Sequence, residues 1–232
     1  MFSRSLTVLF RTAAVALLAG GLTGCSLKTM AVNAVANSLA APSDVMTRDD
    51  DPVFMEAAIP FGLKMYESIL ESTPKHQGLL TATCSGYTSY TYAFVQTPAE
   101  LAQFTDRAAY RAGIDRAQKL YMRAKNYCMR ALEARYPGTG KALLMDPDGA
   151  VRKMKKSDVE LLYWTASSWG LAMSLGKDQP DLVADFPVVR SMAEKALALD
   201  PLWSNGAIHE FFITLDSQPE MLGGSAERAR KH

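Results

Sequence analysis

Histidine and cysteine are the residue types that most often carry chemistry, and this chain has three of each. His209 and Glu210 begin the His-Glu-x-x-His pattern of a zinc-peptidase helix, but the second histidine is replaced by Ile213. The sequence has no Gly-rich phosphate loop, no Cys-x-x-Cys pair and no Gly-x-Ser-x-Gly turn. Catalysis needs a nucleophile with a base, or paired carboxylates in a cleft. We therefore expect no enzyme, no metal site and no cofactor.

The pair His209 and Glu210 has two interpretations. In an otherwise apolar helix the polar groups of such a pair are usually hydrogen-bonded in the protein interior, and we favour that interpretation. If the pair instead faces a groove, it contributes to binding a ligand or partner. A hydrolase with an unrecognised site that uses these two residues remains a rival, and alanine replacement of either residue tests it.

Aromatic residues crowd two segments, Tyr87 to Tyr92 and Tyr163 to Trp169. Tyr87 and Tyr90 are three residues apart and share one side of a helix, whereas Trp164 and Trp169 point about 140° apart. At most one of the two tryptophans therefore faces a common groove. Most of these rings are expected to pack between helices, and the alternative is an apolar pocket with hydroxyls that orient a ligand. The candidate ligand- or partner-binding residues are Tyr87, Tyr90, Trp164, Trp169, His209 and Glu210.

The first 25 residues have the layout of a secretory signal. Arg4 and Arg11 precede an apolar stretch at residues 12–22, which is too short to span a bilayer as a helix. The following Leu-Thr-Gly-Cys at residues 22–25 resembles the lipobox of bacterial lipoproteins. That resemblance implies a lipid on Cys25, cleavage before it, and, because Ser26 follows, an outer-membrane rather than inner-membrane destination. An ordinary cleaved signal with an incidental cysteine is the alternative.

The organisation that follows is a signal at residues 1–24, a lipidated N-terminus and linker at 25–48, and a helical domain at 49–232. The whole chain of 232 residues is 48% hydrophobic and carries a net charge of +1. Loss of Arg4 and Arg11 with the signal makes the mature charge −1, which excludes a nucleic-acid binder that relies on bulk positive charge. Two cysteines remain, Cys84 and Cys128. Their apolar surroundings favour two buried thiols, and an oxidising compartment leaves a disulfide open.

Helical spacing of apolar residues recurs along the mature chain, with almost no strand alternation. It predicts an all-α protein. The expected helices cover residues 26–41, 53–73, 79–95, 98–136 (as one helix or two), 158–175, 187–199 and 205–216, with a looser stretch around 146–149. Ser225 is expected to cap a further short helix. Because a helix that stops at His232 buries little apolar surface, we expect the domain to be C-terminally truncated.

An internal repeat is the strongest structural signal. The segments 65–74 and 192–201 align in Met, Glu, Leu and Pro, and 129–137 fits with a shift of one residue. The prolines that end them, Pro74, Pro137 and Pro201, are 63 and 64 residues apart, close to twice a tetratricopeptide period of about 34 residues. The helices at 79–87 and 161–169 also align, with small residues that allow close packing. We therefore predict a tetratricopeptide-like array of helical hairpins, an α-α superhelix.

Four stretches, residues 47–52, 86–95, 158–170 and 205–213, resemble in this order the TatT family, the T component of TRAP transporters. The resemblance implies a periplasmic, lipid-anchored, all-helical accessory protein of solute uptake. It also implies docking to a TRAP-type solute-binding protein and a hydrophobic ligand, and leaves a homo-oligomer open. The family usually continues beyond the point that matches His232, which agrees with the expected truncation.

A second function uses the same helical array. A lipid-anchored scaffold for envelope assembly would bind peptide segments of its clients on the concave face. Genes for a solute-binding protein and transporter subunits beside this gene favour uptake, whereas assembly genes there favour the scaffold.

Overall fold

The computed structural model describes residues 27–41, 43–45, 48–220 and 223–232. The expected signal and the lipobox with Cys25 lie outside these residues. Within them the secondary structure is helical, with no strand. A helix at residues 27–40 is followed by α2 (Pro52–Ser72), α3 (Gln77–Thr91), the π-helical turn η1 (Tyr92–Gln96), α4 (Thr97–Leu101), α5 (Arg107–Arg135), α6 (Thr139–Met145), α7 (Pro147–Val151), η2 (Lys156–Asp158), α8 (Val159–Leu175), α9 (Pro180–Val183), α10 (Phe186–Leu199), η3 (Trp203–Gly206), α11 (Ala207–Asp216) and α12 (Ala226–Ala229).

Side-chain caps explain where the two long N-terminal helices begin. The carboxylate of Asp51 accepts hydrogen bonds from the backbone N–H groups of Val53 and Phe54, and Pro52 occupies the first turn of α2. Asp106 caps α5 in the same way. An aspartate at this position satisfies N–H groups that have no partner within the helix. Ser225 likewise caps α12 by accepting from Arg228 N–H, as the sequence predicted.

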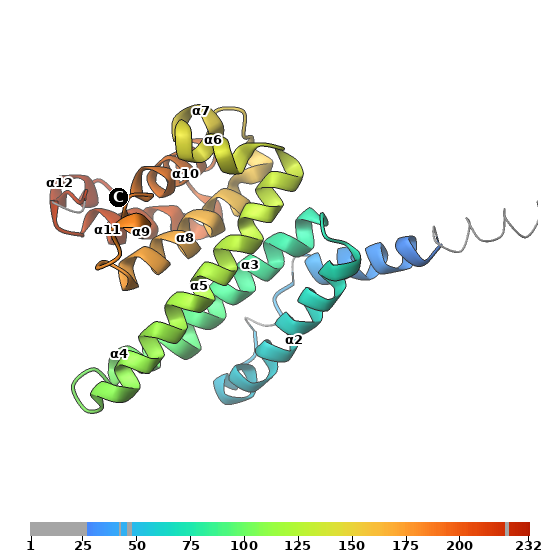
Figure 1. Cartoon of the computed structure of the whole chain (residues 1–232), viewed down its shortest axis with the longest axis horizontal. Coiled ribbons are helices and arrows are strands. Elements are labelled where there is room, and N and C mark those ends of the chain that lie inside the picture. Colours follow the sequence, from blue (N-terminus) through green and yellow to red (C-terminus); the bar gives the residue numbers. More distant parts are fainter. Residues whose placement is uncertain (1–26, 42, 46–47, 221–222) are drawn as a thin grey trace, which may run out of the picture.

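The helices form a single array in which each long helix packs on the next (Figure 1). Helix α2 packs on α3, α3 on α5, α5 on α8, and α8 on α10, while α11 lies against α10 and α8. Short helices α6 and α7 cover one end, next to α10. The predicted all-α helical array is confirmed. No helix in the described part of the chain is long and apolar enough to cross a membrane.

The helices depart most from the prediction in two regions, residues 92–106 and residues 139–151. Helix α3 does not end at residue 95 but continues through the π turn into α4, where Thr97 Oγ1 donates to the carbonyl of Tyr92 at 2.8 Å. Pro98 lies directly after the π turn, at the start of α4. The segment 98–136 is therefore two helices, separated at residues 102–106. The stretch around 146–149 is not loose: Asp146 ends α6 and caps α7 through the N–H of Gly149.

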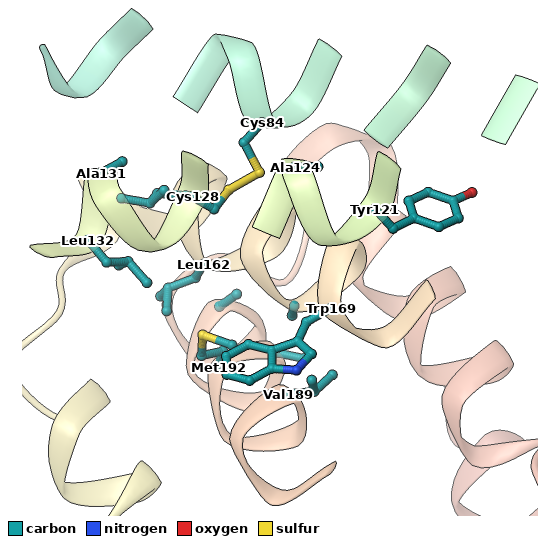
Figure 2. Packing of buried hydrophobic residues seen from close by; sticks show 14 of the residues in the cluster. Cys84, Tyr121, Ala124, Cys128, Ala131, Leu132, Leu162, Trp169, Val189 and Met192 are labelled. Carbon is teal, nitrogen blue, oxygen red and sulfur yellow. A yellow bond between two sulfur atoms is a disulfide. The ribbon is translucent and has the colours of Figure 1, made fainter. Parts of the chain in front are cut away.

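The core contains a disulfide that joins α3 to α5 (Figure 2). Cys84 and Cys128 have Cα atoms 5.4 Å apart, and both residues are fully buried. This corrects the expectation of two separate buried thiols. Small residues on the facing helices, including Ala124 and Ala131, have no exposed surface and let the two helix axes approach closely. Below the disulfide, Leu162, Trp169 and Met192 fill the space between α8 and α10.

Candidate functional site

A groove of about 590 Å³ lies between the α3–η1 segment, α8 and α11. Its volume is in the range of small-molecule sites, roughly 300–1,000 Å³. Most of its lining surface is apolar and comes from six helical elements, α3, η1, α8, α9, α10 and α11. The main apolar residues are Trp164, Leu171, Val183, Phe186, Phe211 and Leu215.

Helix α8 supplies one wall because its groove-facing residues recur every three or four positions. Trp164, Ser167, Leu171 and Ser174 follow this spacing along one face of the helix. Gly170 lies on the same face, where a Cβ atom would be in ordinary van der Waals contact with the ring of Phe211, at 3.4 Å. A larger side chain at this position would push α11 away from α8.

Polar residues also line the groove, but the hydroxyls of Thr88, Ser174 and Thr214 donate to backbone carbonyls of their own helices. Ser167 is 5% exposed, and its Oγ makes no hydrogen bond of good geometry with any described residue. Burial raises the pKa of the Tyr163 hydroxyl, and the nearby Ser167 hydroxyl offsets this only in part. Two charged residues also line the groove, Glu210 from α11 and Lys177 from the loop after α8. The site thus has an apolar body, a buried Ser167 hydroxyl beside that of Tyr163 and a charge of each sign.

A second surface feature is an apolar stripe on α2. Phe54, Phe61 and Met65 lie at positions i, i+7 and i+11 of the helix, and so share one face. They are 60%, 71% and 41% exposed. The residues that α2 buries, Met55, Leu63 and Leu70, lie on the other side. Exposed apolar patches of this kind mark interaction surfaces in soluble proteins.

The comparison with known families identifies the chain. Residues 48–232 match the family described as TRAP transporter T-component, TAtT. The chain belongs to the TRAP transporter T-component family. An uncharacterized protein of Treponema pallidum (strain Nichols) is 31% identical over 228 residues, an alignment that covers 89% of this chain and 70% of that protein. The T-component is therefore an accessory component of a TRAP transporter, associated with the cell envelope and with other components of that transporter.

The structure of this T-component places two of the six predicted binding residues in the groove. Trp164 and Glu210 line it, whereas Tyr87, Tyr90, Trp169 and His209 do not. Trp169 is 2% exposed, and Lys125 Nζ lies 3.5 Å from the centre of its indole ring. Burial lowers the pKa of that lysine. The prediction that at most one of the two tryptophans faces a common groove is confirmed.

Tyr87 and Tyr90 pack between helices on the other side of α3. The hydroxyl of Tyr87 donates to Glu67 Oε1 at 2.8 Å, and its ring stacks on Tyr127 at a centroid distance of 6.1 Å. Tyr90 packs against Phe94, with ring centroids 5.7 Å apart. Both tyrosines are less than 8% exposed, and so they belong to the core of the T-component rather than to its groove.

His209 and Glu210 do not form the expected interior pair. His209 Nδ1 lies 3.0 Å from His232 Nδ1, and the His232 ring stacks on Phe212. Burial and the neighbouring His209 lower the pKa of His232. Glu210 is exposed, because one further residue along α11 turns its side chain toward the groove. Among the residues that the structure describes, no group of three or more His, Cys, Asp or Glu side chains could hold a metal ion.

Tyr92 and Tyr163 also line the groove and were not among the predicted binding residues. Both belong to the aromatic clusters that the sequence singled out. Tyr92 is 55% exposed at the groove edge, on the same helix face as Thr88 and Ser89, which lie four and three residues before it. Helix spacing separates Tyr92 from Tyr87, since residues five apart point about 140° away from each other, but it does not say which of the two faces the groove.

Proposed function

We propose that this T-component is a lipid-anchored periplasmic protein that docks the solute-binding protein of a TRAP-type uptake system and holds a hydrophobic ligand in its groove. The proposed organisation keeps the signal at residues 1–24, the lipidated linker at 25–48 and the helical domain at 49–232. The groove between α3, α8 and α11 is the observation that carries the proposal, because it offers an apolar ligand a site of suitable size on a transporter accessory protein.

The proposed anchor is a lipid on Cys25. Several acyl chains hold a protein stably at a membrane where a single chain gives marginal binding. In cells grown with labelled palmitate, the wild-type protein is expected to carry the label and to sediment with the outer membrane. Cys25→Ser is expected to lose both properties. A variant that stays in the membrane fraction without label would contradict the lipid anchor.

The proposed ligand site is tested with a neutral long-chain alcohol such as dodecanol. Ala93 is exposed and lines the groove mouth, and so Ala93→Trp fills the opening without disturbing the core. We expect this change to weaken dodecanol binding at least tenfold, a loss of about 1.4 kcal/mol. Ala112→Trp, at an exposed position of α5, is the matched control and is expected to bind like the wild type. Equal binding by all three proteins would place the ligand outside the groove.

The apolar stripe of α2 is the proposed docking surface. Phe61 is 71% exposed at its centre, and burial of such a ring against a partner contributes about 1.5–3 kcal/mol. The wild-type lipoprotein, purified from detergent-treated cells, is expected to retain the solute-binding protein, which mass spectrometry identifies. Phe61→Ser is expected to lose it. Phe104→Ser is the matched control, since Phe104 is 92% exposed in the loop after α4.

Two outcomes count against docking. Equal recovery of the solute-binding protein by Phe61→Ser and Phe104→Ser would remove the α2 stripe from the proposal. Repeated recovery of envelope-assembly proteins, and of no solute-binding protein, would favour a scaffold instead.

A further inference from the structure

The two ends of the groove differ in charge and in composition. Phe211 of α11 lies against Tyr163 near the start of α8, and the neighbouring Glu210 acts electrostatically on Tyr163, whereas Lys177 follows the C-terminal end of α8. From Tyr163 to the end of α8 at Leu175 the helix rises about 18 Å at 1.5 Å per residue, and Lys177 lies beyond that end. A ligand that fills the groove therefore meets an acidic end and a basic end that are well separated.

The acidic end is aromatic. The ring centroids of Tyr163 and Trp164 are 5.1 Å apart, and those of Tyr163 and Phe211 are 6.5 Å apart. Trp203 completes the aromatic cluster, and its ring centroid is 4.7 Å from that of Tyr163. Aromatic faces carry negative potential and attract organic cations that come within about 6 Å. The rings are held by one another, so this end of the groove is formed before any ligand arrives.

The carboxylate of Glu210 makes no ion pair or hydrogen bond with the described residues. Its charge reaches the aromatic cluster: after burial, which is the largest cause, Glu210 contributes to the raised pKa of Tyr163. The dipole of α11 favours an acidic residue in its first turn. The dipole does not account for the aromatic rings that line the same end.

Ser167 supplies the third element of this end. Phe211 lies against both Tyr163 and Gly170, and Ser167 is between those two residues on the same face of α8. Ser167 is 5% exposed, and its Oγ makes no hydrogen bond of good geometry with the described residues, although it lies close enough to the Tyr163 hydroxyl to lower the pKa of that group. A buried hydroxyl with unfilled hydrogen-bonding capacity is stabilised by a donor that a ligand brings, here an N–H group.

We propose that the groove selects a long-chain amine in its protonated form. The ammonium head lies at the acidic, aromatic end, where Glu210 supplies the counter-charge, Tyr163 and Trp164 supply aromatic faces, and Ser167 accepts an N–H hydrogen bond. The apolar tail follows Leu171 toward Val183 and Phe186. This inference rests on the ligand-binding part of the proposed function, and it adds the chemical class of the ligand.

The test uses the mature wild-type protein and three probes of equal chain length, dodecylamine, dodecanol and dodecyl sulfate, each below its micelle concentration and at neutral pH. Calorimetry is expected to show that dodecylammonium binds at least tenfold more tightly than dodecyl sulfate, which corresponds to about 1.4 kcal/mol. Glu210→Gln is expected to remove most of this preference and to leave dodecanol binding unchanged. Glu56→Gln, at an exposed position of α2, is the matched control and is expected to keep the preference.

Two further variants separate the contributions of the head-group contacts. Lys177→Gln is expected to weaken dodecyl sulfate and to spare dodecylammonium. Ser167→Ala is expected to weaken dodecylammonium more than its trimethylated analogue, which has no N–H to donate. Circular dichroism checks that each variant is folded.

The outcomes distinguish this inference from the proposed function. Binding of dodecanol together with equal affinities for dodecylammonium and dodecyl sulfate would overturn the amine inference and leave the hydrophobic site standing. A preference for dodecylammonium that survives Glu210→Gln would also overturn it. Failure of the wild-type protein to bind any of the three probes would overturn both.

Discussion

Glu67 joins three helices through a single carboxylate. It lies on α2 and accepts hydrogen bonds from Tyr87 of α3 at 2.8 Å and from Tyr127 of α5 at 3.0 Å. Lys64 and Arg123 supply positive charge beside it. Burial raises the pKa of Glu67, but the hydrogen bonds from Lys64 and the two tyrosines outweigh it and leave the pKa below the ordinary 4.5. The folded state therefore favours the ionised carboxylate.

The first prediction concerns the pH dependence of this contact. A carboxyl whose pKa is lowered by folding stabilises the protein fully above its unfolded pKa, and this contribution is lost as the pH falls through the folded pKa. Glu67→Gln is expected to lower the free energy of unfolding by about 2 kcal/mol at neutral pH. The difference from the wild type should shrink below pH 4.5. Urea unfolding at a series of pH values measures it.

Glu71→Gln is the control for this prediction, because Glu71 is an exposed acid on the same helix. It is expected to unfold like the wild type at every pH. If the difference in unfolding free energy between the wild type and Glu67→Gln stays constant into the acid range, the carboxylate charge does not contribute to the contact.

A second buried carboxylate, Asp216, holds the C-terminal segment. Its Oδ1 accepts from Arg190 of α10 and from Arg228 of α12, the latter at 3.0 Å. The Asp216 side chain is 1% exposed. Burial raises the pKa of Asp216, but the two arginines lower this pKa by more, and the net shift is downward. Asp216 therefore links α10, α11 and α12.

Asp216→Asn is expected to destabilise the protein by about 3 kcal/mol, because it leaves two guanidinium groups without their buried anion. Hydrogen exchange should accelerate first at residues 223–232, which this contact holds against α11. Glu194→Gln, which removes an exposed partner of Arg190, is expected to cost less than about 1 kcal/mol. Equal unfolding free energies for the two variants would contradict the role given to Asp216.

At the scale of elements, the disulfide between α3 and α5 closes a loop with a sequence separation of 44. A cross-link of this loop length stabilises the folded state by about 4 kcal/mol through the entropy of the unfolded chain. We expect reduction of the wild type to lower its urea midpoint. Cys84→Ala combined with Cys128→Ala should show a low midpoint that the reductant leaves unchanged. A wild-type midpoint that is the same before and after reduction would contradict this prediction.

The helices themselves were largely predictable, because prolines, caps and apolar spacing act over a few residues. The break at residues 102–106 was not, since the apolar series Leu101, Phe104 and Ala108 continues across it. In the structure Leu101 is 78% and Phe104 is 92% exposed, so that series does not mark a buried face. The pairing of Cys84 with Cys128 depends on the register of α3 against α5, which no local pattern contains.

The groove was partly predictable for the same reason. The opposite directions of Trp164 and Trp169 follow from helix geometry alone. The exposure of Glu210 depends instead on how α11 is rotated after the backbone reverses at Ser204 and Asn205, both of which have positive φ. That rotation is set by packing against α8, and so the sequence could name Glu210 as a candidate but not place it.

At the scale of the whole molecule, the packing order of the array separates central from peripheral helices. Helix α5 lies between α3 and α8, and α8 lies between α5 and α10, whereas α2 packs on α3 at one edge and α12 on α11 near the other (Figure 1). In an array of this kind stability is the sum of each unit and its neighbouring interfaces. A peripheral helix therefore opens at a lower free energy than a central one.

Hydrogen exchange measured by mass spectrometry tests this order. Amides in the middle of α5 and α8 are expected to exchange only through global unfolding, and those of α2 through a local opening of lower free energy.

Each proposed partner should protect a different part of the array from hydrogen exchange. The solute-binding protein should slow exchange in α2, since docking on the stripe adds an interface that the edge helix otherwise lacks, while a bound alkyl ligand should slow exchange in α11 and in the groove-facing turns of α8. Phe61→Ser should abolish the first effect and keep the second, whereas Ala93→Trp should do the reverse. Protection of α2 by the alkyl ligand alone would instead mean that the edge and the groove are coupled through α3, and the two sites would then have to be treated as one.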